Sequence, residues 1–250
     1  MKNSTSSSFK RLNMSTKVLF TAIVLLFTLT LNLQAQNATT SLPKAGTTAL
    51  LGKADGIAIE GKVQSPAGQA TPLQIVCIFE YEEGDLTSPS ALPAAINGLL
   101  HVDEALKGLI TDLRKNGKFL GHRLETMLIT PPKGSMPAQK LLLIGLGNRK
   151  DFTPDVMTDI GRVGMREALR LGVSSYSHAS DLKDGGIDSP TGTVAVNVVK
   201  GALDAYETEQ YLIRKKVTGH RPLTKLTLLA GQAFFAPSGD AIKAYLSTRN

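Results

Sequence analysis

The 250 residues of this chain, 42% hydrophobic and 20% charged, are enough for one domain with a sizeable core. This composition excludes an intrinsically disordered chain and a protein embedded in a membrane along its whole length. The formal net charge of +7 would favour an anionic partner, but the basic residues are unevenly spread.

The first 35 residues have the pattern of a bacterial secretory signal peptide. Four basic residues precede an apolar run over 18–33: Lys2, Lys10, Arg11 and Lys17. A small-residue site at Leu33-Gln34-Ala35 predicts cleavage between Ala35 and Gln36, whether translation starts at Met1 or Met14. We therefore expect export to the periplasm or the extracellular space. The run is shorter than the roughly 20 residues of a membrane span, so no stable membrane anchor is expected after cleavage.

Cleavage also weakens the case for a polyanionic partner. It leaves 24 basic against 21 acidic side chains, a net charge of +3. The one dense basic cluster, Arg214 to Lys216, has no interleaved aromatic residue beyond Tyr211. We interpret it as a solvated connector and predict no binding to nucleic acid.

The predicted mature chain begins with a flexible leader over 36–55, followed by a single domain over 56–250. The leader begins with a stretch rich in Thr, Ala, Ser and Pro. Alternating apolar residues over 56–63 and an apolar run over 73–79 predict the first two strands. Cys77 lies inside the second run, and as the only cysteine it has no disulfide partner within the chain. We predict that it packs in the core.

Strands and helices then alternate. Leucines at helical spacing over 99–113 predict one amphipathic helix that ends at Asn116-Gly117, with Asp103 and Arg114 on its polar face. Further strands are predicted over 123–130, 140–146, 173–176 and 226–230. Further helices are predicted over 154–171, 194–206 and 240–246, with a turn over 237–240. This order predicts an α/β domain of three layers, a mixed sheet with helices on both faces.

Three passages, in this order, resemble the N-terminal domain of the leucyl (cytosol) aminopeptidase family. They are Phe119-Leu120-Gly121 with Glu125, the stretch from Leu141 to Lys150 with its Gly145-Leu146-Gly147-Asn148 turn, and Gly201 to Tyr206 with Tyr211. Two positions depart from the family pattern, because Lys200 replaces a common Glu and Asp204-Ala205 replaces a Gly-containing pair. The resemblance extends from about Leu73 to Leu212.

The resemblance implies a macro-domain-like fold and places the family's chemistry in a C-terminal domain that this chain lacks. A two-metal peptidase needs several carboxylates and a lysine, and the family's metal-binding strings do not occur here. The four histidines are scattered, and no nucleophile elbow is present. We expect no catalytic residue, no metal and no cofactor, which favours a non-catalytic protein.

Three hypotheses on function follow. The first is a secreted scaffold that oligomerises or binds a protein partner. The second is a module for a small ligand, such as a nucleotide or ADP-ribose, bound by five residues in two turns: Gly145, Gly147, Asn148, Gly185 and Gly186. The first of these turns lacks the dinucleotide fingerprint, because Lys150 occupies the third glycine position, and a tight structural turn is the alternative. An aminopeptidase role would follow from family membership only.

Overall fold

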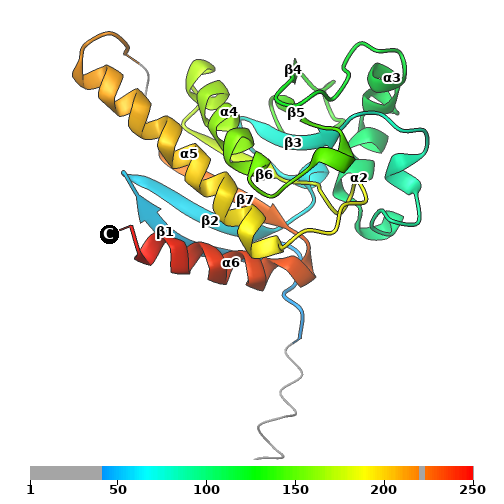
Figure 1. The fold of residues 1–250 in the computed structure, drawn as a ribbon, viewed down its shortest axis with the longest axis horizontal. Coiled ribbons are helices and arrows are strands. Elements are labelled where there is room, and N and C mark those ends of the chain that lie inside the picture. The colour runs from blue at the N-terminus through cyan, green and yellow to red at the C-terminus, as the bar shows by residue number, and fades with distance from the viewer. Residues whose placement is uncertain (1–40, 220–222, 250) are drawn as a thin grey trace, which may run out of the picture. The chain divides into compact units, whose positions relative to one another are not determined.

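A seven-stranded mixed sheet forms the centre of the computed structural model, which describes residues 41–219 and 223–249. The strands follow the order β1-β2-β7-β6-β3-β5-β4 (Figure 1). Their bounds are β1 Thr48–Ala54, β2 Ile57–Val63, β3 Gln74–Phe79, β4 Thr126–Ile129, β5 Leu141–Gly147, β6 Ser175–Ala179 and β7 Lys225–Ala230. The five inner strands are parallel, and β1 and β4 pair antiparallel at the two edges.

Helices cover both faces of this sheet, which confirms the predicted three-layer α/β architecture. The helices are α2 Gly98–Ala105, α3 Leu109–Lys115, α4 Val156–Arg170, α5 Thr191–Arg214 and α6 Gln232–Ser247. In β3, Ile75 and Cys77 belong to the cluster under α4, α5 and α6, whereas Val76 and Ile78 belong to the cluster under α2 and α3. The alternation of side chains along a strand thus divides one apolar run between two cores. Core packing of Cys77 is confirmed.

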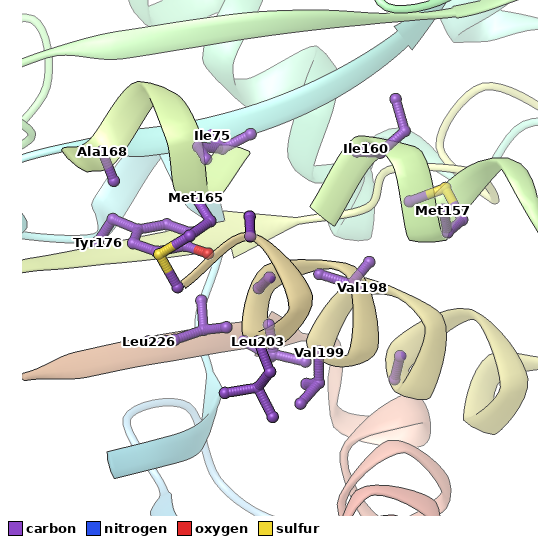
Figure 2. Close-up of a cluster of buried hydrophobic side chains, with 14 of the residues drawn as sticks. Ile75, Met157, Ile160, Met165, Ala168, Tyr176, Val198, Val199, Leu203 and Leu226 are labelled. Atoms are coloured by element: carbon purple, nitrogen blue, oxygen red, sulfur yellow. The ribbon is translucent and has the colours of Figure 1, made fainter. Parts of the chain in front are cut away.

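Helices α4 and α5 pack closely against each other. Figure 2 shows Tyr176 of β6 beside Met165 of α4, with Leu203 of α5 nearby. A Cβ atom added at Gly161 would lie 2.2 Å from the Val198 carbonyl oxygen, and one added at Gly201 would lie 1.8 Å from the Thr158 carbonyl oxygen. The two helices therefore touch backbone to backbone, which only glycine permits at these positions.

The domain begins earlier than the predicted boundary at residue 56. The predicted signal peptide, with its site at Ala35–Gln36, and the first part of the leader lie outside the described residues. Residues 48–54 of the leader, however, form β1, which pairs with β2 through a two-residue turn at Asp55-Gly56. Both turn residues have positive φ, 52° and 83°, as this kind of hairpin requires. The leader prediction missed this Asp-Gly hairpin signal.

The single helix predicted over 99–113 is wrong, because the chain forms α2 and α3 with a break between them. Lys107 and Gly108 adopt left-handed conformations, with φ of 59° and 81°. The Asp103 carboxylate accepts hydrogen bonds from the amides of Ile110 (2.8 Å) and Thr111 (3.1 Å), which stabilises the start of α3. Asp103 and Arg114, predicted on a solvated face, are both buried.

The predicted turn over 237–240 is also wrong, because these residues lie inside α6. This helix begins at Gln232, and Pro237 lies within it. Ile242 and Leu246 are buried, so packing against the sheet outweighs the hydrogen bond that proline removes. Two predicted strands shift at their ends, from 123–130 to β4 and from 173–176 to β6. Over the described ranges, no helix has the length and hydrophobicity needed to cross a membrane.

Candidate functional site

The loops that follow the five parallel strands meet at one edge of the sheet, which is where α/β proteins commonly bind ligands. Gly145 and Gly147 lie at the end of β5 and Asn148 follows it, whereas Gly185 and Gly186 lie in the loop after β6. Arg149 brings the two loops together, because its Nε donates a hydrogen bond to the Gly185 carbonyl oxygen at 3.1 Å. The predicted ligand-binding turns are therefore neighbours.

Each of these two turns is closely packed by the protein itself. A Cβ atom at Gly145 would lie 2.0 Å from the His122 carbonyl oxygen, and one at Gly185 would lie 3.0 Å from the Phe79 ring. Gly147 has a φ of 81°, and Gly186 has a φ of 87° and faces Ser90. The Asn148 side chain accepts a hydrogen bond from the Lys150 amide at 2.9 Å. The glycines thus permit close backbone approach, and their ligand-binding role stays a prediction.

A buried ionic cluster lies between these loops. Asp85 accepts hydrogen bonds from Arg114, at 2.5 Å for the shorter contact, and from Arg149. Arg114 also donates to the Phe79 carbonyl oxygen at 2.9 Å, and Arg149 donates to the Glu80 carbonyl oxygen at 2.7 Å. Because each guanidinium group holds both a carboxylate and a backbone carbonyl, the cluster ties α3 and the loops after β3, β5 and β6 together.

The open space at this edge lies beside the predicted turns, at the ends of β2, β7 and β6. It is a cavity of about 620 Å³. Its apolar wall includes Leu42, Ile96, Val194, Phe234, Phe235 and Ile242. None of the five predicted ligand-binding residues lines it, although the lining residue Asp184 directly precedes Gly185. Segments from six parts of the chain form this cavity, so sequence patterns did not reveal it.

Acidic residues of the loop after β6 form part of the cavity wall. The Asp181 carboxylate accepts a hydrogen bond from the Cys77 amide at 3.1 Å, and the Asp184 carboxylate accepts one from the Gly98 amide. Burial raises the pKa of Asp181, and the nearby charge of Asp184 raises it further. Burial also raises the pKa of Asp184. The two carboxyl groups therefore resist carrying two negative charges at once.

His178 also lines the cavity, and Cys77 lies next to it. The Cys77 Sγ and His178 Nε2 atoms are 3.8 Å apart. Burial raises the pKa of the Cys77 thiol and lowers the pKa of His178 to about 3, so both groups are neutral at pH 7. A neutral, fully buried thiol is a poor nucleophile. In the part of the chain that the structure describes, no three His, Cys, Asp or Glu side chains are grouped to hold a metal ion.

The fold and its carboxyl edge define an α/β domain of the macro-domain type. A macrodomain mutant from Oceanobacillus iheyensis aligns with a TM-score of 0.50 and 16% identity, covering 81% of this chain and 99% of that chain. A second mutant of that macrodomain, solved with ADPR, has the same TM-score and identity and is covered in full. A tomato leucine aminopeptidase mutant also aligns at a TM-score of 0.50 with 16% identity, covering 77% of this chain and 37% of that chain.

Sequence comparison then gives the family. Residues 75–215 match the cytosol aminopeptidase family, N-terminal domain, and the chain belongs to this family. A probable cytosol aminopeptidase from Roseiflexus castenholzii is 30% identical over 129 residues, 51% of this chain. One from Geotalea uraniireducens is 31% identical over 144 residues, 56% of this chain. The aligned part spans 26% of each relative, about a quarter of its length.

Proposed function

We propose that this domain is a ligand-binding module and that its site is the cavity at the ends of β2, β7 and β6. The observation that carries the proposal is the cavity itself. Its volume of about 620 Å³ lies in the range of small-molecule sites, roughly 300 to 1,000 Å³. A largely apolar wall with a few polar groups is the usual composition of such a site.

A thermal-shift screen of the purified protein tests this proposal. The panel contains nucleotides including ADP-ribose, divalent metals, sugars, short peptides and organic acids. A ligand at about 100 times its dissociation constant should stabilise the fold by roughly 2.7 kcal/mol, which raises the Tm by several degrees. The absence of any shift across the panel would contradict the binding role.

A pair of variants shows whether a ligand occupies this cavity. Ala233 is exposed and lines the cavity, whereas Ala236 is exposed on the same helix and does not line it. We expect Ala233→Trp to abolish the shift and Ala236→Trp to preserve it, with both proteins folded. Substitution of Gly147 is a poorer test, because its φ of 81° strains any other residue whether or not a ligand binds there.

Association with a protein partner or a second copy is a further candidate, supported by the carboxyl-terminal end of α5. Tyr211 is 52% exposed and Val217, just beyond the helix, is 69% exposed. In Figure 1 this end of α5 extends past the neighbouring strands. Large apolar side chains on a projecting element often mark an interface. Sedimentation of the protein and of Tyr211→Ser with Val217→Ser tests it, since a monomer at all concentrations would argue against self-association.

We also propose that the chain is exported and contributes no peptidase chemistry of its own. The motif at 1–35 supports export, and N-terminal sequencing of protein recovered from the periplasm or the medium should read from Gln36. The purified protein should release no product from leucine p-nitroanilide with Mn²⁺ or Zn²⁺ present. Robust turnover would instead support an aminopeptidase role, which at present rests only on family membership.

A further inference from the structure

The ends of two neighbouring strands place free hydrogen-bond donors at the cavity. Val63 of β2 pairs with Ala230 of β7, so Ser65 and Gly231 follow parallel strands at the same edge. Both residues line the cavity. The Ser65 Oγ atom is buried and has no hydrogen-bond partner among the residues described. A buried hydroxyl without a partner is costly, so a ligand that hydrogen-bonds to it would be favoured.

Helix α6 begins at this same place. Its N-cap, Gly231, supplies no side-chain acceptor. The Gly231 carbonyl oxygen accepts hydrogen bonds from the amides of Phe234 (2.9 Å) and Phe235 (3.1 Å). The amides of Gln232 and Ala233 have no acceptor within the described ranges, and both residues line the cavity. The positive end of the helix dipole lies here as well, so an anion would be stabilised.

Four charged or titratable side chains of the cavity wall already have partners. The His101 Nε2 atom lies 2.7 Å from the Ala94 carbonyl oxygen. Lys183 pairs with Asp188, and its Nζ atom lies 5.4 Å from the centre of the Phe234 ring. Asp181 and Asp184 each accept a backbone hydrogen bond, as described above. His178 also lines the cavity, but its Nδ1 atom, buried without a partner among the described residues, lies toward Gly164 of α4. The free groups at the amino terminus of α6 are donors, which select an acceptor or an anion.

The rest of the wall favours an apolar body. Phe234 and Phe235 lie in the first turn of α6, directly after the free amides. Ile242, further along the same helix, also lines the cavity. Leu42 and Ile96 are exposed residues of the same lining. An apolar group bound here would be removed from water together with these side chains, which favours binding.

We propose that the cavity binds an apolar organic anion, with its anionic group at the amino terminus of α6 beside Ser65 and its apolar body against Phe234 and Phe235. This inference rests on the binding role proposed above and names the class of ligand. Carboxylates and phosphate monoesters share the required chemistry, and the test includes one of each.

The test compares three naphthalene derivatives of similar size by isothermal titration calorimetry: 2-naphthoate, 2-naphthyl phosphate and the neutral 2-naphthamide. We expect at least one anion to bind about tenfold or more tightly than the amide, because only an anion gains from the helix terminus. The tighter of the two anions identifies the head group. Equal binding of the amide would overturn the anion inference and leave the binding role intact, whereas binding of none of the three would count against both.

Substitutions of Gly231 locate the anionic group. Its φ is −65°, and an added Cβ would lie at ordinary contact distance, 3.4 Å, from the Phe234 ring, so other residues fit there. In Gly231→Asp the new carboxylate caps the free amides and repels an anion. We expect it to weaken anion binding tenfold or more, to change amide binding less than threefold, and to leave the Tm equal or higher. Ala236→Asp adds the same charge at an exposed position of α6 that does not line the cavity, so it is the matched control and should bind all three compounds as the wild type does. Undiminished anion binding by Gly231→Asp would overturn the inference.

Discussion

Asp85 lies between two guanidinium groups, and one of them has no access to water. The Arg114 side chain is fully buried, and among the described residues the carboxylate of Asp85 is the only charge that compensates it at contact distance. We expect Asp85→Asn to lower the free energy of unfolding by about 3 kcal/mol, because removing one partner of a buried ion pair leaves the other charge uncompensated. Urea denaturation measures this loss.

The exposed ion pair nearby provides the control for Asp85. Glu83 and Lys115 are both largely solvent-exposed, and their shortest contact is 3.5 Å. Because solvent screens such a pair, Glu83→Gln should leave the denaturation midpoint unchanged. If the two substitutions changed the denaturation midpoint equally, the buried Asp85 cluster would contribute no more to stability than an exposed ion pair.

His178 makes the stability of the domain depend on pH. Its folded pKa of about 3 is far below the usual 6.5, so the folded protein keeps the ring neutral while the unfolded chain takes up a proton. The contribution of His178 is therefore present above pH 6.5 and is lost as the pH falls toward 3. In His178→Gln this loss disappears. Between pH 7.5 and pH 4.5 we expect the stability advantage of the wild type over the variant to shrink by on the order of 2 kcal/mol.

Urea denaturation of both proteins at several pH values measures this difference. The carboxyl groups titrate equally in the wild type and the variant, so their effects cancel when one curve of stability against pH is subtracted from the other. A difference that stays constant from pH 7.5 to pH 4.5 would mean that His178 becomes protonated within the folded domain.

The crossing of α4 and α5 depends on two glycines, one from each helix. At Gly201 an added methyl group would lie 1.8 Å from the Thr158 carbonyl oxygen, a backbone atom that cannot rotate away. We expect Gly201→Ala to cost at least about 3 kcal/mol, because the helices must separate and loosen the core between them. The neighbouring Lys200→Ala, on the exposed face, should change the Tm by less than a degree or two. If Gly201→Ala left the free energy of unfolding unchanged, the two helices would be able to separate at little cost.

Elements with strong local signals were predicted correctly, and those that depend on distant partners were not. The apolar run at 140–146 became the buried inner strand β5, and Gly201 in the family-like passage became a helix contact. Asp103 and Arg114, by contrast, have the polarity of surface residues, and their buried partners, the start of α3 for Asp103 and Asp85 with the Phe79 carbonyl for Arg114, become apparent only in the folded chain. The cavity could not be predicted for the same reason, because no short sequence pattern shows that Ser65 and Gly231 follow neighbouring strands at the same edge of the sheet.

At the scale of the whole molecule, β1 decides where the domain begins. Leu51 is buried against Gly61 of β2 and Gly239 of α6, so β1 connects the edge of the sheet to the last helix. We expect a chain that starts at Gly56, the predicted boundary, to be at least about 3 kcal/mol less stable than one that starts at Leu42. The shorter chain loses the burial of Leu51 and Ala54 and exposes the edge of β2.

Two measurements on these truncated proteins test the boundary. Urea denaturation gives the free energy of unfolding of each chain, and the binding of a hydrophobic dye reports exposed core surface. The chain from Gly56 should unfold at a lower urea concentration, bind more dye, and lose the cavity wall that Leu51 and Leu42 supply. Ligand binding should therefore fail together with stability in this chain, whereas Ala233→Trp should remove binding alone. If the chain from Gly56 matched the longer one in all three readouts, the strand would be dispensable and the domain would begin at β2.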